Sequence, residues 1–250
     1  MAPRSGAISG MTHWQREVGT DNSIYAMGIR GSLLEQNSLE VQRFTPENTN
    51  FSNPDVIARF QLKKPSMQHS FSITENHAIF MYSPVVLGGG KMCVPMHAFH
   101  LLECTEVLDN ELTDVFIVNL KTGDVKEISA EVLFSVHHIN AYETNDGKEI
   151  ILDLSPTDDN GMKEYPLLDR MLNPPENSTS DETSTCGKDQ VTRYTINLET
   201  KKVEASTFPN LLEGTSYARY INKFDMGVIN EAYRGRKVNK FFLKSKCNKG

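Results

Sequence analysis

The sequence has few cysteines, no long apolar run and no excess of basic residues. Its four cysteines are irregularly spaced and include no Cys-x-x-Cys pair, which argues against a zinc ribbon and against a disulfide framework. No apolar stretch approaches the roughly 20 residues that cross a bilayer, and the first residues lack the apolar core of a secretory signal. We therefore expect a cytoplasmic protein with reduced thiols.

Positive charge is scarce overall but concentrated at one end. The formal net charge is −6, whereas a nucleic-acid partner requires a basic surface, so we expect no nucleic-acid partner. Residues 234–250 contain seven Lys and Arg residues and no acid, which leaves −13 for the first 233 residues. We therefore expect a body over residues 1–237 and a divergent basic tail over 238–250.

The region between Pro84 and Leu112 differs from its surroundings. Residues 87–90 form a glycine-rich loop, but no Lys-Ser or Lys-Thr follows them, so they are not a phosphate-binding loop. The apolar residues 98–102, together with Val107 and Leu108, favour a short helix.

The rest of the chain indicates short strands and tight turns. Residues 23–27, 39–44 and 56–60 are typical strand segments, and an Asp-Gly turn at 145–148 predicts a hairpin. Residues 118–125 recur as residues 196–203, each a strand, a polar turn and a returning strand. Propeller blades repeat at roughly 40 to 50 residues, so the offset between these two hairpins indicates a step of two blades.

Histidines lie within several of these strand segments. His137 and His138 interrupt the apolar run 134–143, where neighbours on a strand face opposite ways, so only one can face a shared site. His69 lies in a similar alternating segment, and His13 precedes the first predicted strand. A single strand histidine is more often a hydrogen-bonded core residue than a ligand. The wide spacing of positions 13, 69 and 137 suits ligands from separate propeller blades rather than a helical His-x-x-x-His site.

Three segments give the chain a family resemblance. They are Lys64 to Asn76, which reads KPSMQHSFSITEN; Val136 to Glu143, which reads VHHINAYE; and, less closely, Thr12-His13 before Ile24-Tyr25. Arg193 to Leu198 adds a fourth. Through these segments the sequence resembles the carotenoid cleavage oxygenases over residues 8 to about 237.

The resemblance implies an all-β fold and a metal site. Family members fold as a seven-bladed β-propeller whose axial Fe(II) is held by four histidines from separate blades. By position, the first three metal ligands fall on His13, His69 and His137, and neutral imidazoles suit iron. The implied activity is a dioxygenase reaction that uses O₂ to cleave a double bond of a carotenoid, apocarotenoid or retinoid polyene. Tyr217 stands where a supporting glutamate is expected, and the fourth histidine falls outside the sequence.

Several alternatives accompany this interpretation. Seven blades of roughly 40 residues need about 280 residues, so we expect a partial, unclosed propeller that is poorly soluble and does not cleave carotenoid by itself. The alternative is an inactive paralogue that acts as a lipid-binding or interaction module. By position, residues 84–108 match an apolar patch through which relatives contact the membrane peripherally, although a helix packed on the propeller explains them equally well.

The remaining histidines are expected to be structural or exposed. These are His77, His97, His100 and His138. For Glu143 two interpretations stay open: a hydrogen bond near the third ligand, or a solvated strand end.

Overall fold

The computed structural model describes sixteen β-strands. The residues it describes are 17–18, 23–30, 38–48, 54–63, 66, 68, 70–87, 105–132, 134–135, 138–154, 192–207, 226–228 and 242–244. The strands are β1 (Glu17–Val18), β2 (Ile24–Arg30), β3 (Ser38–Phe44), β4 (Asp55–Gln61), β5 (Ser72–Ile73), β6 (His77–Tyr82), β7 (Val85–Leu87), β8 (Thr105–Val107), β9 (Thr113–Asn119), β10 (Val125–Ala130), β11 (His138–Thr144), β12 (Glu149–Leu154), β13 (Thr192–Asn197), β14 (Val203–Thr207), β15 (Met226–Val228) and β16 (Phe242–Lys244). The described residues contain no helix, so the predicted all-β class is confirmed for this part of the chain.

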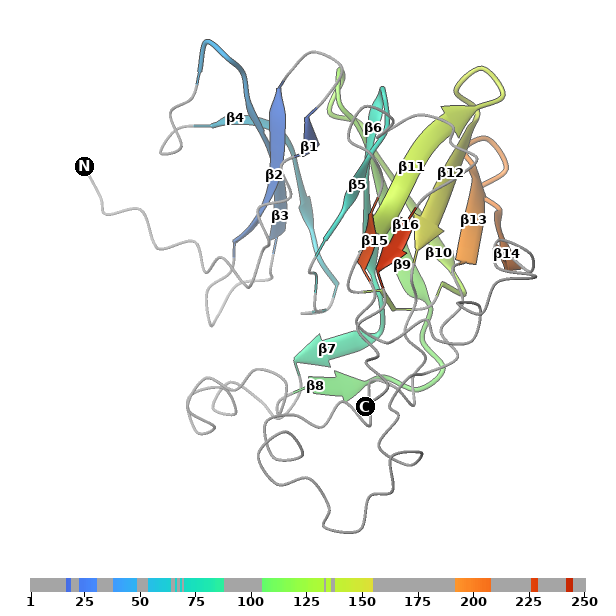
Figure 1. Cartoon of the computed structure of the whole chain (residues 1–250). Coiled ribbons are helices and arrows are strands. Elements are labelled where there is room, and N and C mark those ends of the chain that lie inside the picture. The colour runs from blue at the N-terminus through green and yellow to red at the C-terminus, as the bar shows by residue number, and fades with distance from the viewer. Residues whose placement is uncertain are drawn as a thin grey trace, which may run out of the picture.

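Twelve of these strands form three antiparallel four-stranded sheets that stand side by side (Figure 1). The first sheet has the order β1-β2-β3-β4, the second β10-β9-β6-β5, and the third β11-β12-β13-β14. Each sheet is a meander, with the β7–β8 pair inserted in the second between β6 and β9. Consecutive four-stranded meanders are the arrangement of propeller blades. Within the described residues the sheets do not close into a ring.

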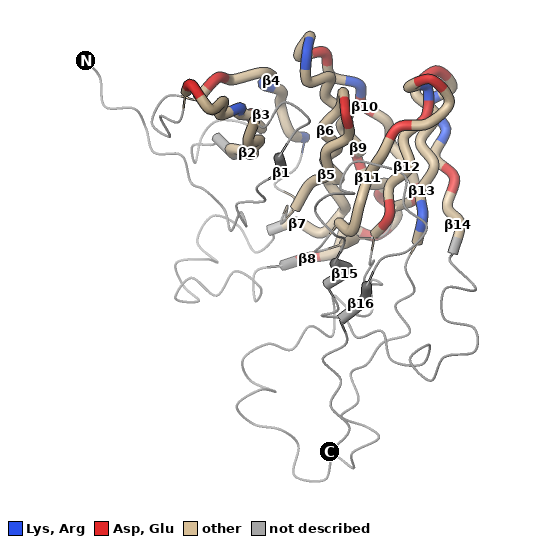
Figure 2. Tube along the Cα trace, turned by 45° about the horizontal axis from the view of Figure 1, so that its top comes forward, with Lys and Arg blue, Asp and Glu red and all other residues tan. Residues whose placement is uncertain are grey.

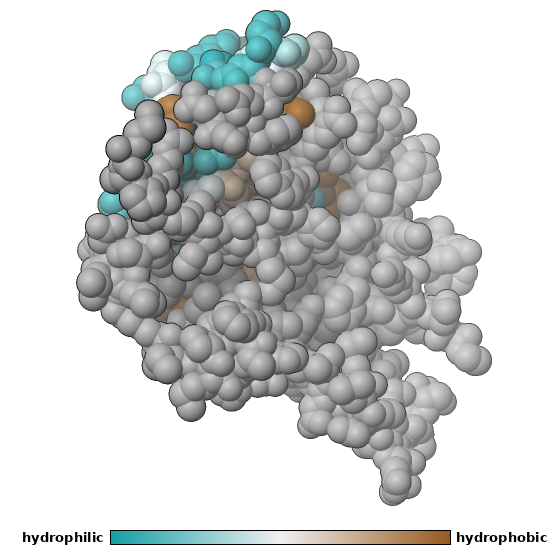
Figure 3. Space-filling model, turned by 90° about the vertical axis from the view of Figure 1, so that its left-hand side faces the viewer, coloured by the Kyte–Doolittle hydropathy of each residue, from teal (hydrophilic) through white to brown (hydrophobic). Residues whose placement is uncertain are grey.

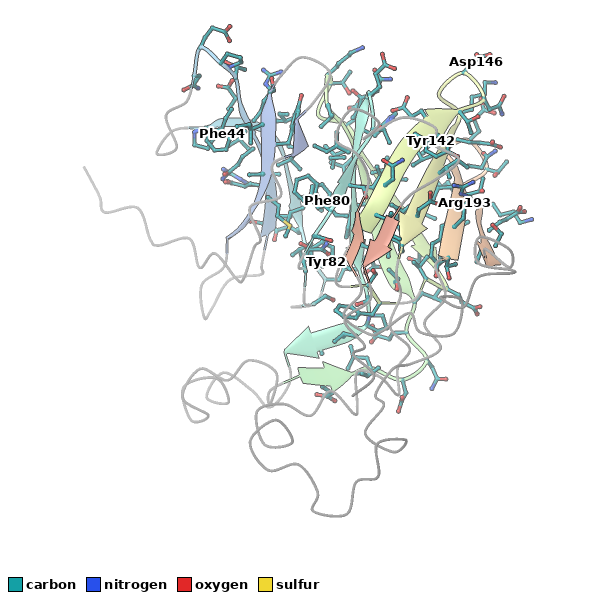
Figure 4. The ribbon with its side chains drawn as sticks, viewed as in Figure 1. Phe44, Phe80, Tyr82, Tyr142, Asp146 and Arg193 are labelled. Carbon is teal, nitrogen blue, oxygen red and sulfur yellow. The ribbon has the colours of Figure 1, made fainter. Side chains whose placement is uncertain are left out.

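The second sheet is buried on both faces: six of the seven residues of β9 and five of the six residues of β6 are buried. Side chains alternate between the faces along each strand. Phe80, Tyr82 and Phe116 lie in a first core shared with the first sheet, and Figure 4 shows Phe80 and Tyr82 on that side. Ile79 and Ile117 lie in a second core shared with the third sheet. The two interfaces are called here the first and the second junction.

The two repeated segments predicted from the sequence both form hairpins, and their turns have the same hydrogen bonds. In the second sheet the Asn119 side chain accepts hydrogen bonds from the N–H groups of Lys121 and Thr122. In the third sheet Asn197 accepts the same two bonds from residues 199 and 200. Each hairpin joins the third and fourth strands of its sheet, and the two sheets are neighbours. The predicted step of two blades is therefore wrong: it is one step, lengthened because residues 155–191 separate β12 from β13.

The predicted strands and the Asp-Gly hairpin are also confirmed. Residues 24–30, 38–44 and 55–61 are strands, and residues 145–148 join β11 to β12. The turn needs left-handed backbone at Asn145, Asp146 and Gly147, whose φ angles are 52°, 52° and 80°. Asn, Asp and Gly are the residues that adopt this conformation most readily.

The helix predicted between Pro84 and Leu112 is not supported at its C-terminal end. Val107 lies in β8 and pairs with Val85 of β7, and the Leu108 N–H donates to the Pro84 carbonyl. Extending a helix to these residues is wrong, because their backbone groups pair with a strand. Residues 98–102 lie outside the described residues. None of the described segments forms a helix able to span a membrane.

The strand β16 lies within the basic tail and pairs antiparallel with β15, so backbone hydrogen bonds link the tail to residues 226–228. Elsewhere charged residues gather at the turns (Figure 2). Examples are Lys121 and Asp124 in one turn and Asp146 and Lys148 in another, all exposed. The described surface seen from the side of the first sheet is mostly hydrophilic (Figure 3).

Candidate functional site

The two segments that carry the family resemblance lie against each other. The first strand of the second sheet, β5, is in contact with the first strand of the third sheet, β11. A turn at Thr74 to Asn76 joins β5 to β6, and the Thr74 N–H donates to the His77 carbonyl. The site is described from the polar side chains between these two segments.

At the start of β11, two serines bind His138. Ser70 Oγ accepts a hydrogen bond from the His138 backbone N–H at 3.1 Å, and Ser72 Oγ lies 2.8 Å from His138 Nδ1. All three residues are buried. Hydrogen bonds of this kind are stronger in a low-dielectric interior, and removing one partner leaves the other desolvated and unsatisfied. These bonds therefore fix the start of β11 against residues 70–72.

At the other end of β11, Glu143 binds the β5–β6 turn. Its carboxylate accepts hydrogen bonds from the Thr74 hydroxyl and from both the backbone N–H and the side-chain amide of Asn76. The His77 Nδ1 lies 3.0 Å from the same carboxylate, whose side chain is only 11% exposed. Burial alone would raise the pKa of Glu143, but the hydrogen bonds from His77, Thr74 and Asn76 outweigh it and lower the pKa to about 2.

These contacts form a continuous set that we call the polar seam. It comprises Ser70, Ser72, Thr74 and Asn76 on one side and His138 and Glu143 of β11 on the other. The four residues of the first side occupy alternate positions of one extended segment, which places Ser70, Ser72 and Thr74 on one face. Phe71 and Ile73 occupy the other face and join the first core.

The three predicted metal ligands, His13, His69 and His137, lie outside the described residues, as does Tyr217. The structure describes the neighbours of two of them: Ser70 follows His69 in the chain, and His138 follows His137. The hydrogen bond between Ser70 and His138 thus joins the chain neighbours of two predicted ligands. Among the described residues, no three His, Cys, Asp or Glu side chains cluster as metal ligands.

Gln68, on the other side of His69, carries an unpaired acceptor. Its amide nitrogen donates to the Ser70 carbonyl, whereas its Oε1 is buried without a hydrogen-bond partner. A buried carbonyl oxygen without a donor is costly, and such an acceptor can orient an imidazole N–H beside a metal. This acceptor and the imidazoles predicted from the sequence are chemically suited to a metal site.

The fourth matching segment also has a defined structural role. Arg193 of β13 donates two hydrogen bonds of 2.8 Å to the fully buried carboxylate of Asp153 in β12. Its guanidinium lies 5.8 Å from the centre of the Tyr142 ring, and Figure 4 shows both on the third sheet. The two hydrogen bonds satisfy the buried carboxylate of Asp153, and the ring contact adds a second interaction for the guanidinium of Arg193.

Most of the polar seam was not predicted from the sequence. His138 and His77 were expected to be structural or exposed, and the rings of both form hydrogen bonds within the protein, which agrees with the structural alternative. For Glu143, the solvated strand end is wrong, since its carboxylate has partners on three residues. The signal available in the sequence was the alternation of Ser, Ser, Thr and Asn at positions 70, 72, 74 and 76.

Comparison with known proteins identifies the family. The family model described as retinal pigment epithelial membrane protein matches residues 8–249, so the match continues through the basic tail. Among curated relatives, the β,β-carotene 15,15'-dioxygenase of Gallus gallus is 31% identical over 115 residues, which are 44% of this chain and 21% of that protein. The enzyme of the same name from Homo sapiens is 31% identical over 104 residues, covering 40% and 19%.

Solved structures agree at the level of the fold. Cobalt-substituted apocarotenoid oxygenase (ACO) from Synechocystis superposes with a TM-score of 0.61 at 20% identity, covering 91% of this chain and 42% of that chain. An ACO/RPE65 chimera gives a TM-score of 0.61 at 18% identity, covering 93% and 43%. The matches thus span about a fifth of the curated relatives and about two fifths of the solved chains. The resemblance inferred from the sequence is confirmed: the chain belongs to the carotenoid oxygenase family described by the retinal pigment epithelial membrane protein model.

Proposed function

We propose that this chain belongs to a non-haem Fe(II) oxygenase that uses O₂ to cleave a double bond of a carotenoid or apocarotenoid. The observation that carries the proposal is the polar seam, which joins the chain neighbours of His69 and His137 by a buried hydrogen bond. Family membership and the β-carotene dioxygenases among the relatives support the reaction class.

His13, His69 and His137 would hold the iron. Neutral imidazoles suit Fe(II), and a site with open coordination positions lets O₂ and a polyene double bond react there. The orphaned Gln68 Oε1 is a candidate acceptor for a ligand's ring N–H. The metal-substituted form in which the Synechocystis relative was solved is consistent with a metal site in this fold.

Within the histidine pair, we assign the ligand role to His137. The His138 ring is already hydrogen-bonded to Ser72 between the second and third sheets. Neighbouring residues on a strand point to opposite faces, so the preceding residue is available for a different site. The role of His138 in this assignment is to hold β11 in place.

Metal content tests the proposal. The 250-residue chain is equilibrated anaerobically with Fe(II), and its bound iron is measured at equilibrium for the wild type and for His69→Ala and His137→Ala. With three of the four histidines present, we expect the wild type to bind iron weakly, and each substitution to remove it. His100→Ala is the matched control, because the sequence assigns this histidine no role as a ligand.

Two outcomes would contradict the assignment. Unchanged iron content in both His69→Ala and His137→Ala would refute the metal site. Loss of iron in His138→Ala at saturating Fe(II), with retention in His137→Ala, would reverse the assignment within the pair. Retinal or apocarotenal released from a carotenoid supplied in detergent, detected by chromatography, would identify the reaction and overturn the expectation that this chain does not cleave carotenoid by itself. Carotenoid bound unchanged by a chain that binds no iron would favour a lipid-binding module.

A further inference from the structure

We infer that Ser70, Ser72 and His138 are positioning residues that set the metal affinity of the site, beyond their contribution to stability. The inference deepens the proposed function and rests on it. Its basis is the polar seam, which ties together the two chain segments that contain His69 and His137.

The polar seam differs chemically from the rest of the second junction. Elsewhere this junction is filled by aliphatic side chains such as Ile79, Ile117 and Leu152. Apolar contacts are non-directional, whereas a hydrogen bond restricts both distance and angle. A buried serine contributes less hydrophobic stabilisation than an aliphatic residue would at the same position. The serines at this junction therefore indicate that a defined geometry is required here.

The anchoring involves both backbone and side chain of one residue. Ser70 binds the His138 backbone N–H, while Ser72 binds the His138 ring. His138 is thus bound from two positions of the opposite segment. These two hydrogen bonds fix both the position of His138 and the orientation of its ring. The peptide unit that precedes His138 is planar and rigid, so fixing this N–H also restricts the carbonyl end of His137.

Glu143 supplies a second anchor at the far end of β11. Its bonds to Thr74 and Asn76 prevent β11 from pivoting about the His138 anchor. Metal sites tolerate displacements of roughly 0.5 Å, and partners that orient ligands commonly change metal affinity by roughly 10- to 100-fold when removed. The serines nearest the predicted ligands are therefore expected to matter most for affinity.

The test measures Co(II) affinity, with Co(II) as an optical probe of the site. Ser72→Ala removes the ring partner of His138. The matched control is Thr113→Val, which removes a buried hydroxyl of β9 that donates to the Val132 carbonyl and is not part of the polar seam. Dissociation constants come from anaerobic titration of the visible absorption of the 250-residue chain, and melting temperatures come from circular dichroism.

We expect both substitutions to lower the melting temperature. Only Ser72→Ala should raise the Co(II) dissociation constant, by roughly 10- to 100-fold, while Thr113→Val should leave it within about twofold of wild type. Ser70→Ala, which removes the acceptor of the His138 backbone N–H, is the second variant and should raise the dissociation constant in the same way as Ser72→Ala. Equal effects of Ser72→Ala and Thr113→Val on the dissociation constant would overturn the inference.

The two proposals fail in different ways. If the wild type binds Co(II), His69→Ala abolishes binding and both serine variants bind as tightly as wild type, the positioning role is refuted while the metal site stands. If the wild type binds no Co(II), or binds it equally after His69→Ala and His137→Ala, the proposed metal site is refuted, and the positioning role with it.

Discussion

The two junctions of the second sheet use different chemistry. The first junction is aromatic: Phe80 packs on Phe71 with ring centres 4.9 Å apart, and Phe60 packs on Phe116 at 4.6 Å. The second is aliphatic and is supplemented by the buried polar seam. Aromatic burial gives a large stabilisation with broad geometric tolerance, whereas hydrogen bonds define register. The junction that carries the candidate site is the one with directional contacts.

The largest effect on stability is expected from a substitution in the aromatic first junction. Phe80 is fully buried and contacts the rings of both Phe71 and Phe60. Phe80→Ala should lower the free energy of unfolding by about 3–5 kcal/mol, because a cavity adds to the lost burial. Urea unfolding followed by circular dichroism measures it. Phe80→Leu keeps most of the volume and should cost under about 2 kcal/mol; equal losses would contradict the packing explanation.

The second-largest effect is expected from a substitution in the polar seam, and its effect on stability depends on pH. The pKa of Glu143 is lowered to about 2 from 4.5, so between these values the unfolded chain binds more protons than the folded one. Its contribution of about 2–3 kcal/mol is present above pH 4.5 and is lost as the pH falls through about 2. Glu143→Gln should remove most of it at pH 7 and flatten the stability profile below pH 4.5. An unchanged profile would contradict the role assigned to Glu143.

Substitutions at two glycines are expected to have effects of intermediate size on stability. Gly123 and Gly147 both have left-handed backbone, with φ of 78° and 80°. A Cβ on Gly123 would lie 2.5 Å from the Ile57 carbonyl oxygen across the first junction, whereas on Gly147 the nearest atom is 3.5 Å away. Gly147→Ala should cost about 1 kcal/mol from backbone strain, and Gly123→Ala about 2 kcal/mol or more. Melting curves compare the two, and the reverse order would show that the sheets can separate freely here.

The smallest effect concerns an exposed polar contact of the first junction. Lys63 and Glu127 form an ion pair between the first and second sheets, with side chains 64% and 37% exposed. Solvent screening keeps such pairs below about 1 kcal/mol. Glu127→Gln should therefore change the free energy of unfolding by less than about 0.5 kcal/mol, also in 1 M salt. A loss as large as that of Glu143→Gln would remove the distinction between the two junctions.

Local features were predictable from the sequence. The strands β2, β3 and β4 follow from apolar alternation, and the Asp146-Gly147 turn from its requirement for left-handed backbone. The equivalence of the hairpins at Asn119 and Asn197 was also visible, because residues 118–125 recur as residues 196–203. The structure shows the same side-chain hydrogen bonds in both turns. Their separation was misread, since nothing local reveals that residues 155–191 are inserted between two strands of one sheet.

Features set by long-range pairing were not predictable. Val107 belongs to a short apolar run, and such runs are compatible with a helix or a strand until a partner is known. Its partner, Val85, is fixed by the fold. The polar face of residues 70–76 was likewise visible as a pattern, but only packing against β11 shows that Ser72 and Glu143 belong to one seam.

The order of folding is a consequence of how far apart the seam's partners lie along the chain. Ser72 and His138 are separated by 66 positions, Ser70 and His138 by 68, and Thr74 and Glu143 by 69. The hairpins at Gly123 and Gly147 close over a few residues, which costs far less chain entropy than closing these long loops. We therefore expect the hairpins to form early and the seam late, so that the geometry of the candidate metal site is acquired in one of the last steps of folding.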